Sequence, residues 1–162
     1  MQLFTNDDYS ILQQSEIFHN LSTDDIEDLC EYCELLERER GKLLLAEGSA
    51  GNGLYIILDG SVEIYLPKNT QEGNDRISEV HIAVLKRKDC FGEYSLIDHD
   101  RASASIRAKT SLRLCYISTK KFQQLVDENY KTGRYIYENL LHLFVHRLRN
   151  NIKELDVAFV LR

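Results

Sequence analysis

The sequence predicts an α+β fold that is mainly β, in which a closed β-roll is flanked by N-terminal helices and one long C-terminal helix. Short apolar runs separated by glycine-containing turns occupy residues 41–117, a pattern typical of a closed sheet. Apolar residues at helical spacing precede and follow this region. With 162 residues, 43% of them hydrophobic, the chain is expected to form a single domain, 1–162, with its helices in 1–40 and 118–162.

The N-terminal region carries a helix start signal. Ser22 and Asp25 have the S-x-x-D spacing of a capping box, in which each side chain bonds the backbone N–H of the other residue. The helix that follows is expected to extend through residue 36 and to end before Gly41, because apolar residues continue at helical spacing: Ile26, Leu29, Cys30, Cys33 and Leu36.

The predicted β-roll consists of short strands between turn signals. Asp59-Gly60 is a hairpin turn, and the exposed loop around residues 67–74 contains the only proline. Ser118 is expected to cap the helix that follows the roll. The runs that predict strands are residues 43–46, 54–58, 62–66, 77–85, 102–108 and 113–117.

Residues 91–108 hold the most informative pattern of the chain. Phe91-Gly92-Glu93 ends a strand-like run, and residues 94–97 form one short helical turn. A glycine at such a turn lets backbone N–H groups approach a phosphate, and Glu93 supplies acceptors for sugar hydroxyls. The small residues 102–104 leave room above the next strand. A tight corner of a β-barrel also requires small residues, so the pattern alone leaves both interpretations open.

This segment resembles the phosphate-binding cassette of the cyclic nucleotide-binding domain family, FGE-x-[AGS]-L followed by R-[AST]-A-[TS]. Residues 41–66 are similar to the first half of that family, with Gly48, Gly51 and Gly60 in the expected turns. The resemblance covers nearly the whole chain and implies a jelly roll in 41–117 with the cassette in 91–105. It implies a ligand site formed by Gly92, Glu93, Tyr94, Ser95, Leu96, Asp98, Arg101, Ala102, Ser103 and Ser105.

The cassette departs from the family at one position. Ala102 stands where the family usually has the arginine that pairs with the cyclic phosphate, and Arg101 lies one residue earlier. Adjacent strand residues point to opposite faces, so Arg101 is expected on the wrong side of the sheet. Losing such a contact costs about 3–5 kcal/mol, which argues against ordinary cyclic AMP binding. A bulge that turns Arg101 inward would restore the charge, and Arg107 is a less favoured substitute.

Three functions remain open. The first is a sensor of a nucleotide second messenger with an unusual ligand such as cyclic di-GMP, whose guanine Arg101 and nearby aspartates could bind. The second is a degenerate domain that binds no ligand and serves as a dimeric interaction module, which Lys88 favours because the family often has glycine there. The third is a cyclic AMP sensor that uses Arg101 after a local rearrangement. The family resemblance implies that a ligand moves the long helix about a hinge near 129–133, where Gly133 interrupts the helical pattern.

The last helix carries an apolar repeat. Its members alternate at spacings of four and three, which is the seam that two supercoiled helices require. The stripe therefore predicts a homodimer, although docking on the chain's own barrel is the alternative, and the part near Leu141 is expected to dock in that way. The predicted dimerisation residues are Leu141, Val145, Leu148, Ile152, Leu155 and Phe159.

Composition excludes several function classes. The net charge of −6 and pI of about 5.4 provide no overall basic surface for nucleic acid. Family members often continue into a winged-helix domain, whereas this chain stops at Arg162, so we expect no DNA binding by this chain. Neither a signal peptide nor a membrane span is expected. The downstream protein partner is unknown.

The metal-ligating and nucleophilic residue types are sparse. Cys30 and Cys33 form an isolated C-x-x-C, best explained as buried thiols of a cytoplasmic protein. His142 and His146 lie one helical turn apart without a third ligand, and His81 has no carboxylate cluster at fixed spacing. We therefore expect no metal, no cofactor and no catalysis.

Overall fold

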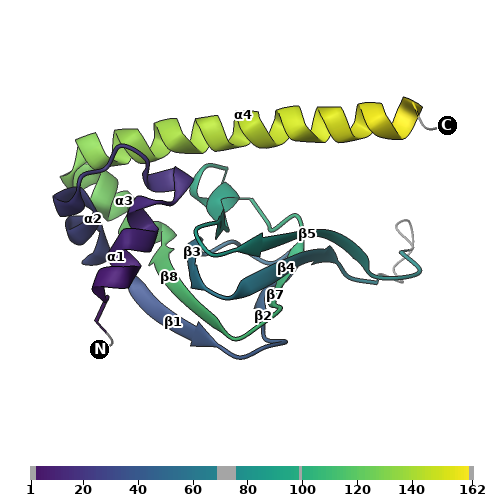
Figure 1. Cartoon of the computed structure of the whole chain (residues 1–162), viewed down its shortest axis with the longest axis horizontal. Coiled ribbons are helices and arrows are strands. Elements are labelled where there is room, and N and C mark those ends of the chain that lie inside the picture. Colours follow the sequence, from purple (N-terminus) through teal and green to yellow (C-terminus); the bar gives the residue numbers. More distant parts are fainter. Residues whose placement is uncertain (1–2, 69–75, 99, 161–162) are drawn as a thin grey trace.

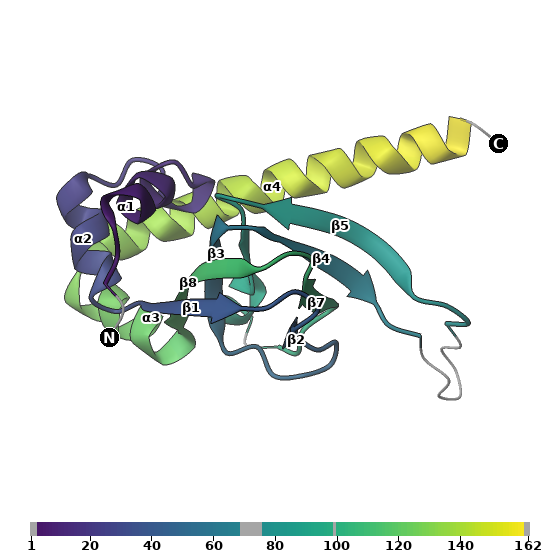
Figure 2. The same ribbon diagram turned by 60° about the horizontal axis from the view of Figure 1, so that its bottom comes forward.

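The computed structural model describes residues 3–68, 76–98 and 100–160, with the side chains of 154 and 156–160 outside the description. Helices gather at one end of the molecule, the β-roll forms the other, and the last helix runs along both (Figures 1 and 2). The elements in order are α1 Asn6–Gln13, η1 Glu16–Phe18, α2 Thr23–Cys30, β1 Glu34–Arg38, β2 Leu43–Leu45, β3 Gly53–Asp59, β4 Ser61–Leu66, β5 Val80–Lys86, β6 Cys90–Phe91, η2 Glu93–Leu96, β7 Ser105–Ala108, β8 Leu112–Ser118, α3 Thr119–Glu128 and α4 Tyr130–Val160.

The roll consists of two four-stranded antiparallel sheets, in the orders β1-β8-β3-β6 and β2-β7-β4-β5. The sequence predicts this β-roll and its flanking helices correctly. The capping box is present, since the Ser22 hydroxyl accepts from the N–H of Asp25 and the Asp25 carboxylate accepts from the N–H of Ser22. Ser118 caps α3 as expected, with its hydroxyl accepting from the N–H of Lys121.

Strand β3 separates the two parts of the core. Leu54, Ile56 and Leu58 face the cluster shared with the helices, whereas Tyr55 and Ile57 face the cluster inside the roll. A strand buried on both faces needs a continuous apolar run rather than an alternating one. The sequence LYIIL supplies that run.

The region after α2 corrects one expectation. The helix was expected to reach Leu36, but it ends at Cys30, and Glu34–Arg38 is β1, which pairs with β8. Residues 1–40 therefore contribute a strand to the roll as well as helices. Of the two thiols expected to be buried, Cys30 is buried while Cys33 is half-buried in the turn after the helix. Pairing with β8 overrides the helical spacing, which continues by chance into the strand.

Helix α4 is anchored at its N-terminal half. The buried Asn139 amide donates to the carbonyls of Ile17 and His19 at 3.0 and 2.8 Å. The helical path breaks at Asn129, whose side chain accepts from the N–H of Thr132. Gly133 lies inside α4 rather than interrupting it, and a Cβ there would come within 2.9 Å of Val126. No helix in the described ranges is both long and apolar enough to cross a bilayer.

Candidate ligand-binding site

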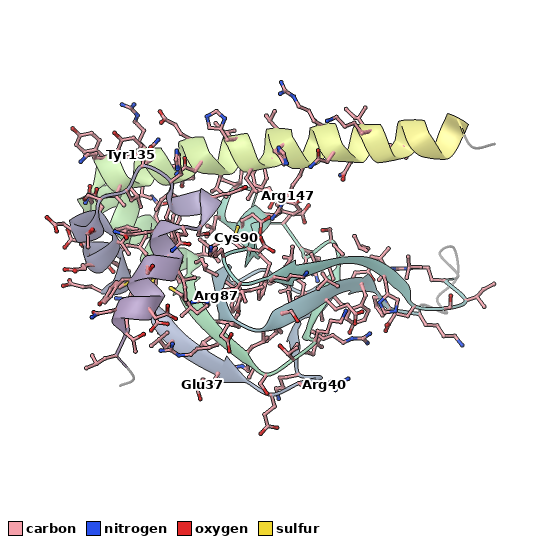
Figure 3. All side chains as sticks on the ribbon, viewed as in Figure 1. Glu37, Arg40, Arg87, Cys90, Tyr135 and Arg147 are labelled. Carbon is pink, nitrogen blue, oxygen red and sulfur yellow. The ribbon has the colours of Figure 1, made fainter. Side chains whose placement is uncertain are left out.

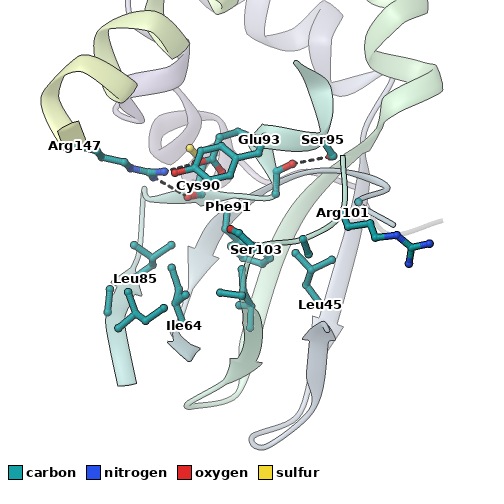
Figure 4. Close-up of a pocket in the computed structure, with 18 of the residues that line it drawn as sticks. Leu45, Ile64, Leu85, Cys90, Phe91, Glu93, Ser95, Arg101, Ser103 and Arg147 are labelled. Carbon is teal, nitrogen blue, oxygen red and sulfur yellow. Dashed lines mark hydrogen bonds and ion pairs between the residues drawn. The ribbon is translucent and has the colours of Figure 1, made fainter. Parts of the chain in front are cut away.

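A cavity of about 610 Å³ lies between the inside of the β-roll and α4 (Figure 4). Its apolar walls come from β2, β4, β5 and β7 and include Leu45, Ile64, Leu85 and Ile106. Its polar end is formed by the cassette and α4, and includes Glu93, Ser95, Ser103, Arg147, Asn150 and Asn151. An apolar cleft with a few convergent polar groups is the usual form of a small-molecule site.

The turn at the start of the cassette requires glycine. Gly92 has φ +81°, and a Cβ on it would lie 2.4 Å from the carbonyl oxygen of Gly53. Gly51 packs on the same turn, since its Cβ would lie 2.3 Å from the Cβ of Ser95. The Ser95 hydroxyl donates to the Gly92 carbonyl at 2.8 Å. The cassette backbone is thus held against the roll with no space for larger side chains at either glycine.

Glu93 is only 3% exposed and forms an ion pair with Arg147 of α4. The Arg147 Nη1 donates to Glu93 Oε1, and its Nη2 donates to the Cys90 carbonyl at 3.3 Å. Burial opposes the charge, but the Glu93 carboxylate beside it raises the pKa of Arg147 above its ordinary value. Figure 3 shows Arg147 reaching from α4 toward the roll near Cys90.

A second contact joins the cassette to α4. The rings of Tyr94 and Phe144 meet edge to face with centroids 5.4 Å apart. Phe144 and Arg147 are three residues apart and therefore lie on one helix face. Arg147 was not among the site residues expected from the sequence. A sequence signal for Arg147 is its helical spacing from Leu140, Leu143 and Phe144, which pack against the core from the inner face of α4.

Arg101 does not point into the cavity. It is exposed, its Nη1 donates to the Gly48 carbonyl at 2.7 Å, and Figure 4 shows its guanidinium directed away from the cavity. Residue 101 forms an isolated bridge with Ala50, and β7 begins only at Ser105 rather than at 102 as expected. Arg101 was expected to point away from the cavity because it precedes Ala102 by one residue, and it does point away. The expectation assumed that both residues lie on a strand, whereas β7 begins only at Ser105.

Arg107 is also engaged outside the cavity. Ile106 lines the cavity, so Arg107 points to the opposite face of β7. Its guanidinium bonds Glu63 and Glu79. These carboxylates also meet His81, whose Nδ1 lies 2.6 Å from Glu63 Oε1. The sequence offers no carboxylate cluster at fixed spacing from His81, but the fold brings Glu63 and Glu79 to it, because strand pairing joins residues that have no fixed sequence spacing. The guanidinium of Arg107 already pairs with the carboxylates of Glu63 and Glu79 and supplies positive charge to this cluster.

The structure brings most of the expected ligand residues together. Gly92, Glu93, Tyr94, Ser95, Ala102 and Ser103 line the cavity, as does some part of Arg101. Three others lie elsewhere. Leu96 is buried in the core at 5% exposure, the Asp98 carboxylate accepts from the N–H of Asp100, and the Ser105 hydroxyl accepts from the N–H of Glu47. None of these three is among the residues that line the cavity.

The predicted apolar stripe of α4 lies on the surface. Its exposed fractions are 64% for Leu141, 46% for Val145, 61% for Leu148, 57% for Ile152 and 59% for Leu155. The side chain of Phe159 lies outside the described residues. The expectation that the part near Leu141 docks on the barrel is wrong, because Ile136, Leu140, Leu143 and Phe144 perform that docking from the other face.

Comparison with known proteins identifies the family. The sequence model of the cyclic nucleotide-binding domain matches residues 35–129. The cyclic AMP receptor protein of Thermus thermophilus is 26% identical over 90% of this chain and 63% of its own length. A cAMP-dependent protein kinase regulatory subunit of Yarrowia lipolytica is 31% identical over 54% of this chain and 21% of its own length.

Solved structures agree with this assignment. A cyclic nucleotide-binding domain from Methylobacillus flagellatus has a TM-score of 0.77 and 26% identity, covering 91% of this chain and 80% of that one. The catabolite activator protein of Thermus thermophilus has a TM-score of 0.73 and 27% identity, covering 88% and 62%. The chain spans less than two thirds of the first curated relatives it matches, at 63% and 62% of their lengths. With its glycine-built cassette, buried Glu93 and matching roll, the chain belongs to the cyclic nucleotide-binding domain family.

Proposed function

We propose that this protein is a non-catalytic sensor that binds a nucleotide second messenger in the cavity between the β-roll and α4. The observation that carries the proposal is the cassette itself. Its backbone is fixed by Gly92 at φ +81° and borders a cavity of about 610 Å³ with apolar walls and a polar end. A nucleotide has a similar division, between a base whose flat aromatic faces pack on apolar side chains and a polar sugar phosphate.

The ligand we propose is an unusual one such as cyclic di-GMP. Ala102 carries no charge to pair with a cyclic phosphate, and the guanidinium of Arg101 is directed toward Gly48 instead. A cyclic AMP sensor that uses Arg101 would have to break that bond and reverse the side chain. The same direction of Arg101 argues against its binding guanine, so a cyclic dinucleotide would have to use other groups of the cavity.

We propose that the active form is a homodimer formed through α4. Five described members of the stripe are at least 46% exposed, and they share one face of a helix at the spacing of a coiled-coil seam. Free thiols at Cys30, Cys33, Cys90 and Cys115 fit a reducing compartment such as the cytoplasm.

A second candidate function is a dimeric interaction module that binds no nucleotide. One observation favours it: one oxygen of the Glu93 carboxylate, which would accept a sugar hydroxyl, is already bonded to Arg147 of the same chain. Lys88 adds to this, because it adopts φ +80°, a conformation suited to the glycine that the family often has there.

Calorimetric titration with cyclic AMP, cyclic GMP and cyclic di-GMP tests these candidates. Binding of cyclic di-GMP tighter than the other two supports the sensor with an unusual ligand. Submicromolar binding of cyclic AMP overturns the choice of ligand, and absence of binding for all three favours the module.

A restoring substitution sharpens the test. Ala102→Arg returns the missing guanidinium to the cavity, and Ala102→Gln is the matched uncharged control. We expect Ala102→Arg to strengthen cyclic AMP binding by about two decades or more, the value of a charged phosphate contact, with little change for Ala102→Gln. Equal affinities for the two variants would contradict the reasoning from residue 102.

A further inference from the structure

The polar end of the cavity contains a buried negative charge that bears on any anionic ligand. Glu93 is 3% exposed, and it directly follows the glycine turn of the cassette. A phosphate brought near this carboxylate would be repelled, and the repulsion is strong where water is largely excluded. An anionic ligand therefore needs positive charge close to this carboxylate to offset the repulsion.

Two basic residues line the cavity within the described part of the chain, Arg101 and Arg147. The guanidinium of Arg101 is directed away and bonded to the Gly48 carbonyl (Figure 4). The guanidinium of Arg147 lies inside, on Glu93 and the Cys90 carbonyl. Positive charge therefore enters the cavity from α4 rather than from the cassette.

The contacts of Arg147 leave it able to bind a second anion. An arginine has five N–H donors in a planar fork, and the two contacts described here use two of them. One of these, to the Cys90 carbonyl, is long at 3.3 Å. A guanidinium can hold one carboxylate and turn its other edge to a phosphate, and its hydrogen bonds to either anion are charge-assisted.

We propose that Arg147 is the cationic ligand-binding residue of this site. It donates to the phosphate of an anionic nucleotide while still bonded to Glu93, so that the cation reaches the ligand from α4 and not from position 102 of the cassette. This inference rests on the proposed function and specifies which residue binds the ligand. The simpler alternative is that Arg147 only neutralises Glu93 and fastens α4 to the cassette.

The position of Arg147 links the ligand to the proposed dimer seam. Leu148, the next residue, lies on the outer face of α4 and is 61% exposed. A phosphate that draws on Arg147 therefore acts on the same turn of helix that presents Leu148. Ligand binding is then expected to alter the mobility of α4 around 147–148, in addition to the cassette.

A double-substitution cycle on the full chain separates the two roles. Binding of cyclic AMP, cyclic GMP and cyclic di-GMP is measured by calorimetry for the wild type, Arg147→Gln, Glu93→Gln and the double variant. Arg149→Gln is the matched control, because it removes the same charge from an exposed site two residues away. Arg147→Lys keeps a cation at the site, and thermal unfolding verifies that each variant is folded.

We expect Arg147→Gln to weaken the binding seen for the wild type at least tenfold, Arg149→Gln to change it less than twofold, and Arg147→Lys to restore part of the loss. In the Glu93→Gln background, which has no carboxylate to neutralise, loss of Arg147 should still weaken binding at least tenfold. Equal affinity of Glu93→Gln and the double variant would overturn the role in binding phosphate while leaving the proposed function intact. Absence of wild-type binding to cyclic AMP, cyclic GMP and cyclic di-GMP alike would overturn both.

Discussion

Replacing Leu148 with aspartate is expected to dissociate the proposed homodimer without unfolding the chain. Leu148 occupies the middle of the exposed stripe of α4, between Val145 and Ile152. Its side chain contributes little to the core of a single chain, because 61% of its surface remains exposed. The substitution therefore acts on the contact between two chains.

The magnitude follows from this exposure. Full burial of a leucine stabilises by about 1.5–3 kcal/mol, so burial of the exposed share of Leu148 contributes about 1–2 kcal/mol per chain. A symmetric dimer buries two copies, for a total of about 2–4 kcal/mol. At 1.4 kcal/mol per tenfold change, the dimer dissociation constant should rise roughly thirty- to several-hundred-fold. Repulsion between two facing carboxylates adds to this loss.

Sedimentation equilibrium over a range of concentrations measures the effect. His146→Asp is the matched control, since it places the same carboxylate on α4 two residues away, outside the 4-3 stripe. The control should dimerise like the wild type, and Leu148→Asp should be monomeric at concentrations where the wild type is dimeric. A monomeric wild type at high micromolar concentration, or equal dimerisation of both variants, would refute the reasoning.

Three further predictions concern single residues. Arg101→Ala should change nucleotide affinity less than twofold, because its guanidinium bonds the exposed Gly48 carbonyl; a tenfold loss in calorimetry would return Arg101 to the site. Asp8→Asn should cost about 2–3 kcal/mol of unfolding free energy at pH 7, since Asp8 is fully buried and bonded to Arg113 at 2.8 Å. Burial opposes ionisation of Asp8, but hydrogen bonds from Thr5 and Arg113 lower its pKa below the ordinary 3.8. The contribution of Asp8 to stability is therefore present above pH 3.8 and is lost as the pH falls through the lowered pKa. Urea unfolding at pH 7 and pH 3 should therefore show the wild type and Asp8→Asn converging in acid, and a constant difference would contradict this. Lys88→Gly should raise the free energy of unfolding by about 1 kcal/mol in the same assay, because glycine adopts φ +80° without strain and keeps the backbone bond to Ile57. A loss of stability would show that the lysine side chain matters more than its backbone strain.

The parts of the fold that the sequence predicts are those encoded locally. The capping box at Ser22, the cap at Ser118 and the glycine turn at Gly92 each depend on residues a few positions apart. The apolar run of β3 is similarly local. Strand β1 was misassigned as helix because its identity depends on β8, more than seventy residues away, and the residues of α2 and β1 happen to share a helical spacing.

The candidate site shows the same division. The cassette residues were predicted from a contiguous motif, and most of them line the cavity. Arg147 was missed because it lies 54 positions from Glu93, and only the tertiary fold brings the two together. The cluster of Glu63, Glu79 and His81 was missed for the same reason, since pairing of β4 with β5 creates it.

A crystal structure of the protein bound to the tightest-binding of the three nucleotides tests whether Arg147 holds the phosphate. We expect a phosphate oxygen at about 3 Å from the guanidinium of Arg147, beside the Gly92 turn, with Arg101 still bonded to the Gly48 carbonyl. A phosphate held instead by Arg101, or a nucleotide bound away from the cassette with Arg147 unchanged on Glu93, would contradict it.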